Sequence, residues 1–263
     1  MADWIAQLDV AKLLIFTLVL TRVSGLVMTA PIFGSTDVPM RIRALLAMAL
    51  SVLILPSQWD TPVADPETNV QYAVVLAGEL LIGLTLGLGI TILFSGFQLA
   101  GQLIERMGGM MLAEVFDPAS GENVPLFSRF LYLTGLAVFL LIGGHRAVMA
   151  ALLDTFSALP PGSGTVPVDI ADTFVILVGQ SFSLGIRAAA PVVTALLLST
   201  LVMGLISRTL PQLNILAVGF GANALITFGA VFFVLGASVW VFQQQVDPAL
   251  SLLFESLEVT NPP

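Results

Sequence analysis

Apolar residues fall into long, nearly uninterrupted blocks along the chain. The blocks lie at about 10–33, 41–56, 70–104, 126–153, 170–207 and 213–242. A bilayer core about 30 Å thick requires roughly 20 apolar residues in one spanning helix. Lipid offers no partner to backbone N–H and C=O groups, and the blocks lack the strict alternation of barrel strands. The pattern predicts an all-α integral membrane protein of about six long, partly broken helices arranged in hairpins.

Two of these blocks are longer than a bilayer requires. As single helices rising 1.5 Å per residue, 70–104 and 170–207 would be roughly 52 and 57 Å long. The second contains Pro191, which removes a backbone donor inside a helix. We expect both blocks either to project beyond the membrane or to break, and both outcomes require neighbouring protein.

Small residues recur at four-residue spacing within the blocks, a pattern that allows helix backbones to approach closely. The pairs are Gly83 with Gly87, Gly96 with Ala100, and Gly185 with Ala189. They serve packing either within the chain or between subunits.

The composition agrees with the membrane assignment and narrows the chemistry. Of 263 residues, 57% are hydrophobic and 10% are charged, against about 25% charged in soluble domains. The chain has no cysteine, which leaves neither a disulfide framework nor a thiolate metal site. No nucleophile elbow, phosphate loop or metal-ligand spacing is present. We expect no enzymatic activity, no cofactor and no metal.

Three ionisable residues lie deep in the apolar blocks: Arg22, Glu79 and Arg187. A charge at the centre of a membrane helix costs about 2.5–3.5 kcal/mol on insertion scales, so each residue should have a partner. They either pair within the bundle or serve an ion path or an intersubunit salt bridge. A proton relay would require a longer series of titratable groups, and the only histidine, His145, fits a helix entry better.

A polar, glycine-rich segment at about 105–125 interrupts the apolar pattern. Gly108 and Gly109 oppose regular structure, and loops of about twenty residues are usually functional or disordered. Met107, Met110 and Met111 are flexible, polarizable side chains that adapt to irregular apolar surfaces. The segment is either a surface loop with incidental methionines or a movable apolar element.

Several stretches resemble the FliR family of flagellar biosynthetic proteins and its counterpart in virulence-associated type III secretion. They include "RVSGLVMTAPIFG", "GELLIGLTLGLG" leading to "AGQLIERMGG", "GGHRAVMAALLDTFSALPPG" and "RTLPQLNILAVGF". In that family the residues corresponding to Arg208, Pro211, Gln212 and Asn214 form a hallmark turn between the last two long helices. One departure is Gly221, where a proline is expected.

The resemblance implies a subunit of the export gate that passes unfolded proteins across the bacterial inner membrane, in the flagellar basal body. Its partners would be FliP-like and FliQ-like membrane subunits, with an FlhB-like protein at the entrance. Residues 1–160 would be a FliP-like part that includes the loop, and 161–263 a FliQ-like hairpin and tail. Met107, Gly108, Gly109, Met110 and Met111 would correspond to the plug of the closed pore.

Two other functions remain open on the residues alone. A secondary transporter or channel for small solutes would account for broken helices and buried charges, yet such folds usually contain paired halves, and no internal repeat is convincing. A membrane scaffold without a pore would account for the packing motifs.

Overall fold

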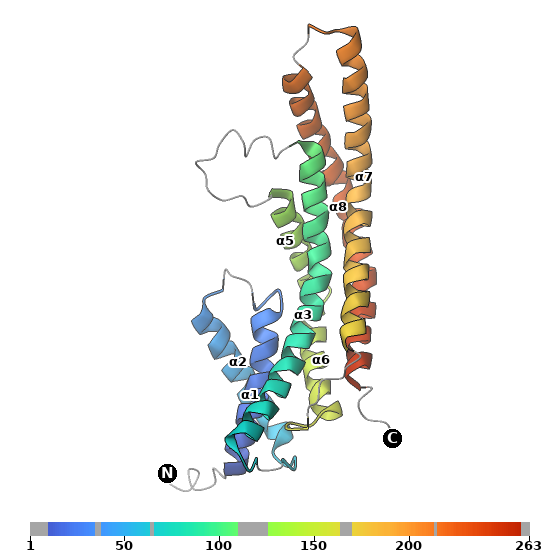
Figure 1. Ribbon diagram of the computed structural model, residues 1–263. Helices are drawn as coiled ribbons and strands as arrows, with labels where there is room; N and C mark the ends of the chain where they lie inside the picture. The colour runs from blue at the N-terminus through green and yellow to red at the C-terminus, as the bar shows by residue number, and fades with distance from the viewer. Residues whose placement is uncertain are drawn as a thin grey trace. The chain divides into compact units, whose positions relative to one another are not determined.

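The computed structural model describes residues 10–34, 38–63, 66–109, 126–163, 170–212 and 215–258 (Figure 1). Every regular element in these ranges is helical. They are α1 (Val10–Thr29), α2 (Met40–Ile54), the 3-10 turn η1 (Leu55–Gln58), α3 (Asn69–Gly108), α5 (Leu126–Leu141), α6 (Gly144–Ala158), α7 (Ile170–Thr209) and α8 (Ile215–Glu258). The predicted all-α membrane fold is confirmed.

The overlong blocks extend as helices and do not break. α3 and α7 each contain 40 residues, and Pro191 lies inside α7 without ending it. α8 contains 44 residues and continues to Glu258, well beyond the expected end near 242. A proline removes one backbone hydrogen bond, and the turns on either side retain theirs. The long helices therefore carry their apolar surfaces past a single bilayer thickness.

The break in the bundle occurs in the block at 126–153, which was expected to be one element. α5 and α6 meet at a bend of 68°. Gly143 has a φ of 81° at this bend, a left-handed conformation that glycine adopts without a steric penalty. The α5–α6 pair is thus one broken element.

The chain forms two compact units, each made of separate stretches of sequence. The first contains residues 1–92, 143–177 and 247–263, and the second contains residues 93–142 and 178–246. The chain passes between the units within α3, α7 and α8, and between α5 and α6. The expected division at residue 160 into FliP-like and FliQ-like parts rests on family resemblance and stays a prediction.

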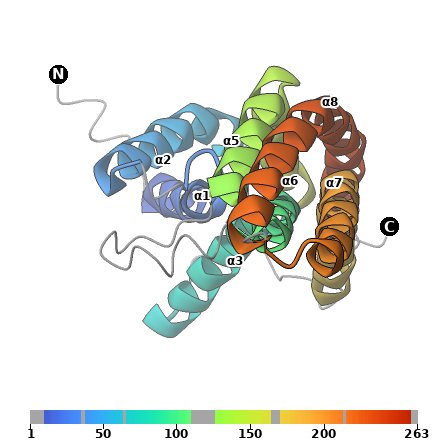
Figure 2. The ribbon, with the colours of Figure 1, turned by 90° about the horizontal axis from the view of Figure 1, so that it is seen from above.

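In the first unit, α1 lies beside α2 and beside the first half of α3 (Figures 1 and 2). Leu18 and Val23 of α1 and Ile82 of α3 are completely buried. α1 and α3 run in the same direction. Thr17 near the start of α1 bonds to Tyr72 near the start of α3, and Thr29 at the end of α1 bonds to Thr91 farther along α3. α2 provides the return between them.

In the second unit, α5 packs against the second half of α3. Phe94 of α3 meets Tyr132 and Phe139 of α5 edge to face, with ring centroids 5.8 and 5.4 Å apart. α7 and α8 form a long hairpin (Figure 1), in which Ser199 donates a hydrogen bond to Asn223 at 2.7 Å.

Within the described residues, four helical stretches are long and apolar enough to cross a membrane, and the bent α5–α6 pair makes a fifth. The four are Lys12–Thr29, Met40–Gln58, Asn69–Gly108 and Ile170–Thr209. Within the most apolar 18-residue segment of each helix, only 17% of α7 is buried, against 61% of α3. α7 therefore presents most of its apolar surface to its surroundings.

Candidate functional site

The centre of the first unit is a buried ion pair between two of the three charges that the sequence singled out. Nε of Arg22 on α1 donates to Oε2 of Glu79 on α3 at 2.6 Å, and both side chains have no accessible surface. A buried pair of this kind must recover the large free energy of removing two charges from water. Additional hydrogen bonds to both partners provide part of that recovery.

Arg22 also joins α1 to α6. Its Nη1 donates to the backbone carbonyls of Thr155 and Leu159 at 3.0 and 2.9 Å. The guanidinium lies over the ring of Phe156, 4.3 Å from the ring centroid. Its Nη2 is buried without a hydrogen-bond partner among the described residues. Arg22 therefore binds carbonyls at the carboxyl end of α6, of which that of Thr155 also accepts the N–H of Leu159 at 2.9 Å.

Glu79 extends the same network to the chain that follows α6. Its Oε1 accepts the backbone N–H of Gly162 at 2.8 Å. Gly162 has a φ of 87°, which a residue with a β-carbon would adopt only with strain. The network thus links α1, α3, α6 and the start of the connection to α7, all within the first unit.

The third predicted charge, Arg187, has no part in this network. It is exposed at the middle of α7 and forms no ion pair with a described residue. Arg22 and Glu79 are inaccessible in the single chain and Arg187 is accessible, so the three charges do not form one group.

The glycines of α3 in the first unit pack within the chain. A β-carbon on Gly83 would overlap the backbone carbonyl of Arg22, and one on Gly87 would overlap the side chain of Thr29. On α1, a β-carbon on Gly25 would lie 2.7 Å from the carbonyl oxygen of Leu80. The two backbones are therefore in direct contact beside the ion pair.

The second unit contains an equivalent contact between α3 and α7. A β-carbon on Gly96 would lie 2.5 Å from the carbonyl oxygen of Ser181, and one on Gly185 would lie 2.8 Å from that of Gly96. The hydroxyls of Ser95 and Ser181 are hydrogen-bonded at 2.9 Å. All three small-residue pairs thus lie on helices that pack closely within the chain, and for the four glycines the intramolecular interpretation holds.

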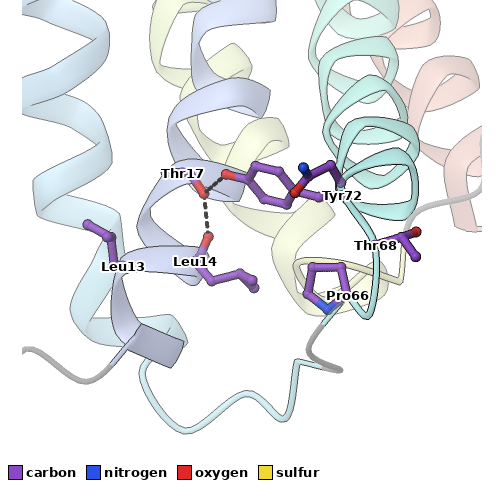
Figure 3. A pocket seen from close by; sticks show the side chains of 7 residues that line it. Leu13, Leu14, Thr17, Pro66, Thr68 and Tyr72 are labelled. Carbon is purple, nitrogen blue, oxygen red and sulfur yellow. Dashed lines mark hydrogen bonds between the residues drawn. The ribbon is translucent and has the colours of Figure 1, made fainter.

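An open pocket of about 390 Å³ lies at the start of α1 and α3 (Figure 3). Its side chains are mostly apolar, and Tyr72 points toward α1, where its hydroxyl donates to Thr17 Oγ1 at 2.8 Å. Thr17 in turn donates to the carbonyl of Leu14 at 2.8 Å. The hydrogen bond between Tyr72 and Thr17 thus holds α1 against α3 at this pocket.

The structure corrects the start of the predicted loop. α3 continues through Met107 and Gly108, so the loop does not begin near 105. Of Gly108 and Gly109, which were expected to oppose regular structure, only Gly109 has a positive φ, of 74°. A glycine in this conformation directly after the last helical residue is a common helix terminator, and Gly108 completes the last turn. Met110 and Met111 lie outside the described residues.

The residues that flank this segment are held together by contacts that sequence reasoning missed. Glu105 of α3 is buried and its Oε1 accepts the N–H of Phe127, the second residue of α5, at 2.5 Å. Ser128 donates to the carbonyl of Gln98 at 2.9 Å, and a β-carbon on Gly101 would overlap the backbone of Ser128. The available signal was an acid directly after an apolar block, about twenty residues before the next block begins.

The predicted family turn lies between α7 and α8. Arg208 is in the last turn of α7, and Pro211 and Gln212 are in the connection. The N–H of Leu210 donates to the carbonyl of Ile206 at 2.9 Å and closes the helix. Asn214 lies outside the described residues.

The described residues include no cluster of three His, Cys, Asp or Glu side chains with metal-binding geometry. The buried charged groups Arg22, Glu79 and Glu105 bond to backbone groups at helix ends or to one another.

Comparison with known proteins assigns the family. Residues 13–249 match the family of bacterial export proteins, family 1. The chain is 35% identical to the flagellar biosynthetic protein FliR of Escherichia coli strain K12 over 205 residues, or 76% of each chain. It is 31% identical to FliR of Pectobacterium carotovorum over 224 residues (84% of this chain, 80% of the relative) and 30% identical to FliR of Bacillus subtilis strain 168 over 217 residues (81% and 83%).

These matches cover both units and nearly every described helix, and they give no support to the alternative of a small-solute transporter. The chain belongs to family 1 of the bacterial export proteins, together with the flagellar FliR proteins.

Proposed function

We propose that this chain is the FliR-type subunit of the flagellar type III export gate, which conducts unfolded proteins across the bacterial inner membrane. The observation that carries the proposal is the match of residues 13–249 to the bacterial export family, together with FliR relatives that align over most of their length. A flagellar role is favoured because these relatives are flagellar proteins.

The external surface of the chain supports a role within a larger membrane complex. α3 and α7 are about 60 Å long at 1.5 Å per residue, twice the thickness of a bilayer core. The exposed surface of α7 carries many large apolar side chains. Apolar surface that extends beyond the hydrocarbon layer is stable only against other protein.

The partners in this proposal are FliP-like and FliQ-like membrane subunits, with an FlhB-like protein at the gate entrance. Their assignment comes from the family resemblance. The α7–α8 hairpin would provide the FliQ-like surface, and the preceding helices the FliP-like surface. Arg208, Pro211, Gln212 and Asn214 would form the turn that sets the length of this hairpin.

The segment from Met107 to Met111 is proposed as the plug of the closed channel. Gly109 supports this role, because its positive φ directs the chain away from the axis of α3 and a β-carbon there would meet no described atom within 4 Å. Apolar contacts between methionines and a channel wall exclude water when closed and leave no charge unpaired when they separate.

The three membrane charges are proposed to serve assembly and not proton transfer. Arg22 and Glu79 bond to each other and to backbone groups, which is the arrangement of a structural pair. Their contribution to assembly is indirect: they fix the shape of the subunit that its partners recognise.

Co-expression tests the proposal. The chain, tagged and produced alone in detergent, should be polydisperse, and co-expression with FliP-like and FliQ-like subunits should yield a defined complex whose components are identified by mass spectrometry. A stable, monodisperse monomer that recruits neither subunit would contradict the proposed function.

A further inference from the structure

One face of α7 is exposed and apolar over most of the helix length in the second unit. It includes the side chains of Ile186, Leu198, Leu201 and Leu205. Gly179 and Gly204 also lie on it, and a β-carbon on either would meet no described atom within 4 Å. A neighbouring helix could therefore approach closely at both ends of this face.

Arg187 lies in the middle of this apolar face. At 3.6 residues per turn, Leu198, Leu201 and Leu205 follow Arg187 by about three, four and five turns and share its side of the helix. All four side chains are exposed, while Ala188 and Ala189 beside Arg187 are buried against the chain. The guanidinium thus faces whatever covers α7.

No acidic residue of α7 can reach Arg187. The nearest charged residues along α7 are Asp172 and Arg208, about 22 and 32 Å away at 1.5 Å per residue. Both distances exceed the reach of an arginine side chain. An arginine inside so long an apolar stretch requires a partner on a protein or a position facing water.

We propose that Arg187 is an intersubunit contact that pairs with a carboxylate on a membrane helix of a partner subunit packed along α7. This inference rests on the proposed function, since it requires a membrane complex. Charge complementarity selects a carboxylate, and the fork of guanidinium N–H donors matches it in geometry. The apolar residues above and below Arg187 exclude water from the pair.

The pair also gives α7 a defined register against its partner. An apolar face such as this one allows a helix to slide by a turn with little change in buried area. A single ionic contact between otherwise apolar helices is favourable in only one register, because every other register leaves a charge unpaired.

The inference is tested in co-expressed complexes with Arg187→Leu, Arg187→Lys and the control Thr194→Val. Thr194 lies on the same face, and its hydroxyl is bonded to the carbonyl of Ala190 in its own helix. We expect Arg187→Leu to reduce recovery of partner subunits by about a hundredfold, Arg187→Lys to restore most of it, and Thr194→Val to have no effect. Leucine favours membrane insertion, and the amount of each variant in the membrane is measured in parallel. Equal amounts show that a loss of partner recovery reflects assembly and not insertion.

A cysteine at this position distinguishes an intersubunit pair from a residue that lines the channel. The chain has no native cysteine, so Arg187→Cys is the single labelling site. We expect a water-soluble thiol reagent to leave it unlabelled in any assembled complex. Labelling in the complex, or full recovery of partners with Arg187→Leu, would overturn the inference and leave the proposed function intact. Failure of the wild-type chain to recover any partner subunit would contradict both the inference and the proposed function.

Discussion

Glu79 of α3 accepts hydrogen bonds from both sides of the first unit, from Nε of Arg22 at 2.6 Å through Oε2 and from the N–H of Gly162 through Oε1. The side chains of Arg22 and Glu79 are fully buried. Neither residue can touch a partner subunit directly, so any effect of their substitution on the complex must pass through the shape of this subunit.

Glu79→Gln should destabilise the subunit by about 3–5 kcal/mol, because it leaves the buried guanidinium of Arg22 without its counter-charge. The measurement is thermal unfolding of the assembled complex together with the yield of complex. The double replacement Arg22→Met with Glu79→Leu should cost less than the single change, since it removes both charges. A Glu79→Gln complex that assembles normally and fails only in export would refute the structural role.

Gly83→Ala should separate α1 from α3, since the new β-carbon would overlap the backbone carbonyl of Arg22 and backbone cannot move aside cheaply. We expect a loss of stability of about 1–3 kcal/mol, measured by thermal unfolding. Gly229→Ala is the matched control within α8, where a β-carbon would meet no described atom within 4 Å. That control should be neutral or stabilising by up to about 1 kcal/mol, and equal losses at both sites would contradict the packing argument.

Glu105→Ala should loosen the start of α5, because the buried N–H of Phe127 loses its acceptor. The expected cost is about 1–2 kcal/mol, the usual range for loss of a helix cap. Faster hydrogen exchange of the first turn of α5 would report the change locally. Glu105→Gln keeps an acceptor oxygen and should retain most of the protection; a glutamine variant as loose as the alanine variant would exclude this role.

Deletion of Met107 to Met111 should leave the complex assembled and make the cell membrane permeable to ions or small molecules, if this segment is the plug. The measurement is membrane permeability in cells that produce the deletion, with the complex isolated in parallel. Because Met107 and Gly108 belong to α3, replacement of Met110 and Met111 by serine provides a second variant that keeps the helix intact. An assembled deletion complex that remains as tight as wild type would make the segment an ordinary surface loop.

The apolar pattern was sufficient to predict an all-α membrane protein and the approximate start of every described α-helix except α6, because spanning a bilayer imposes a minimum length of apolar sequence. The same pattern identified Arg22 and Glu79 as residues that need a partner, because placing a charge deep in an apolar block costs free energy. The glycines at 83 and 87 were identified by their spacing, which places them on one face of a helix.

Tertiary contacts decided the rest. Residues 22, 79, 155 and 162 are distant in the sequence, and only the packing of α1, α3 and α6 brings them together. The same packing decided that Gly83 and Gly96 serve contacts within the chain, because their spacing is equally suited to a partner helix. The sequence also could not show that the helix breaks at Gly143 and not at Pro191. A helix can continue through a proline. Whether a glycine takes the left-handed conformation depends on how the flanking helices pack. The separation of Arg187 from the buried pair was likewise invisible in the sequence, since burial of a side chain depends on which face of α7 the rest of the chain covers.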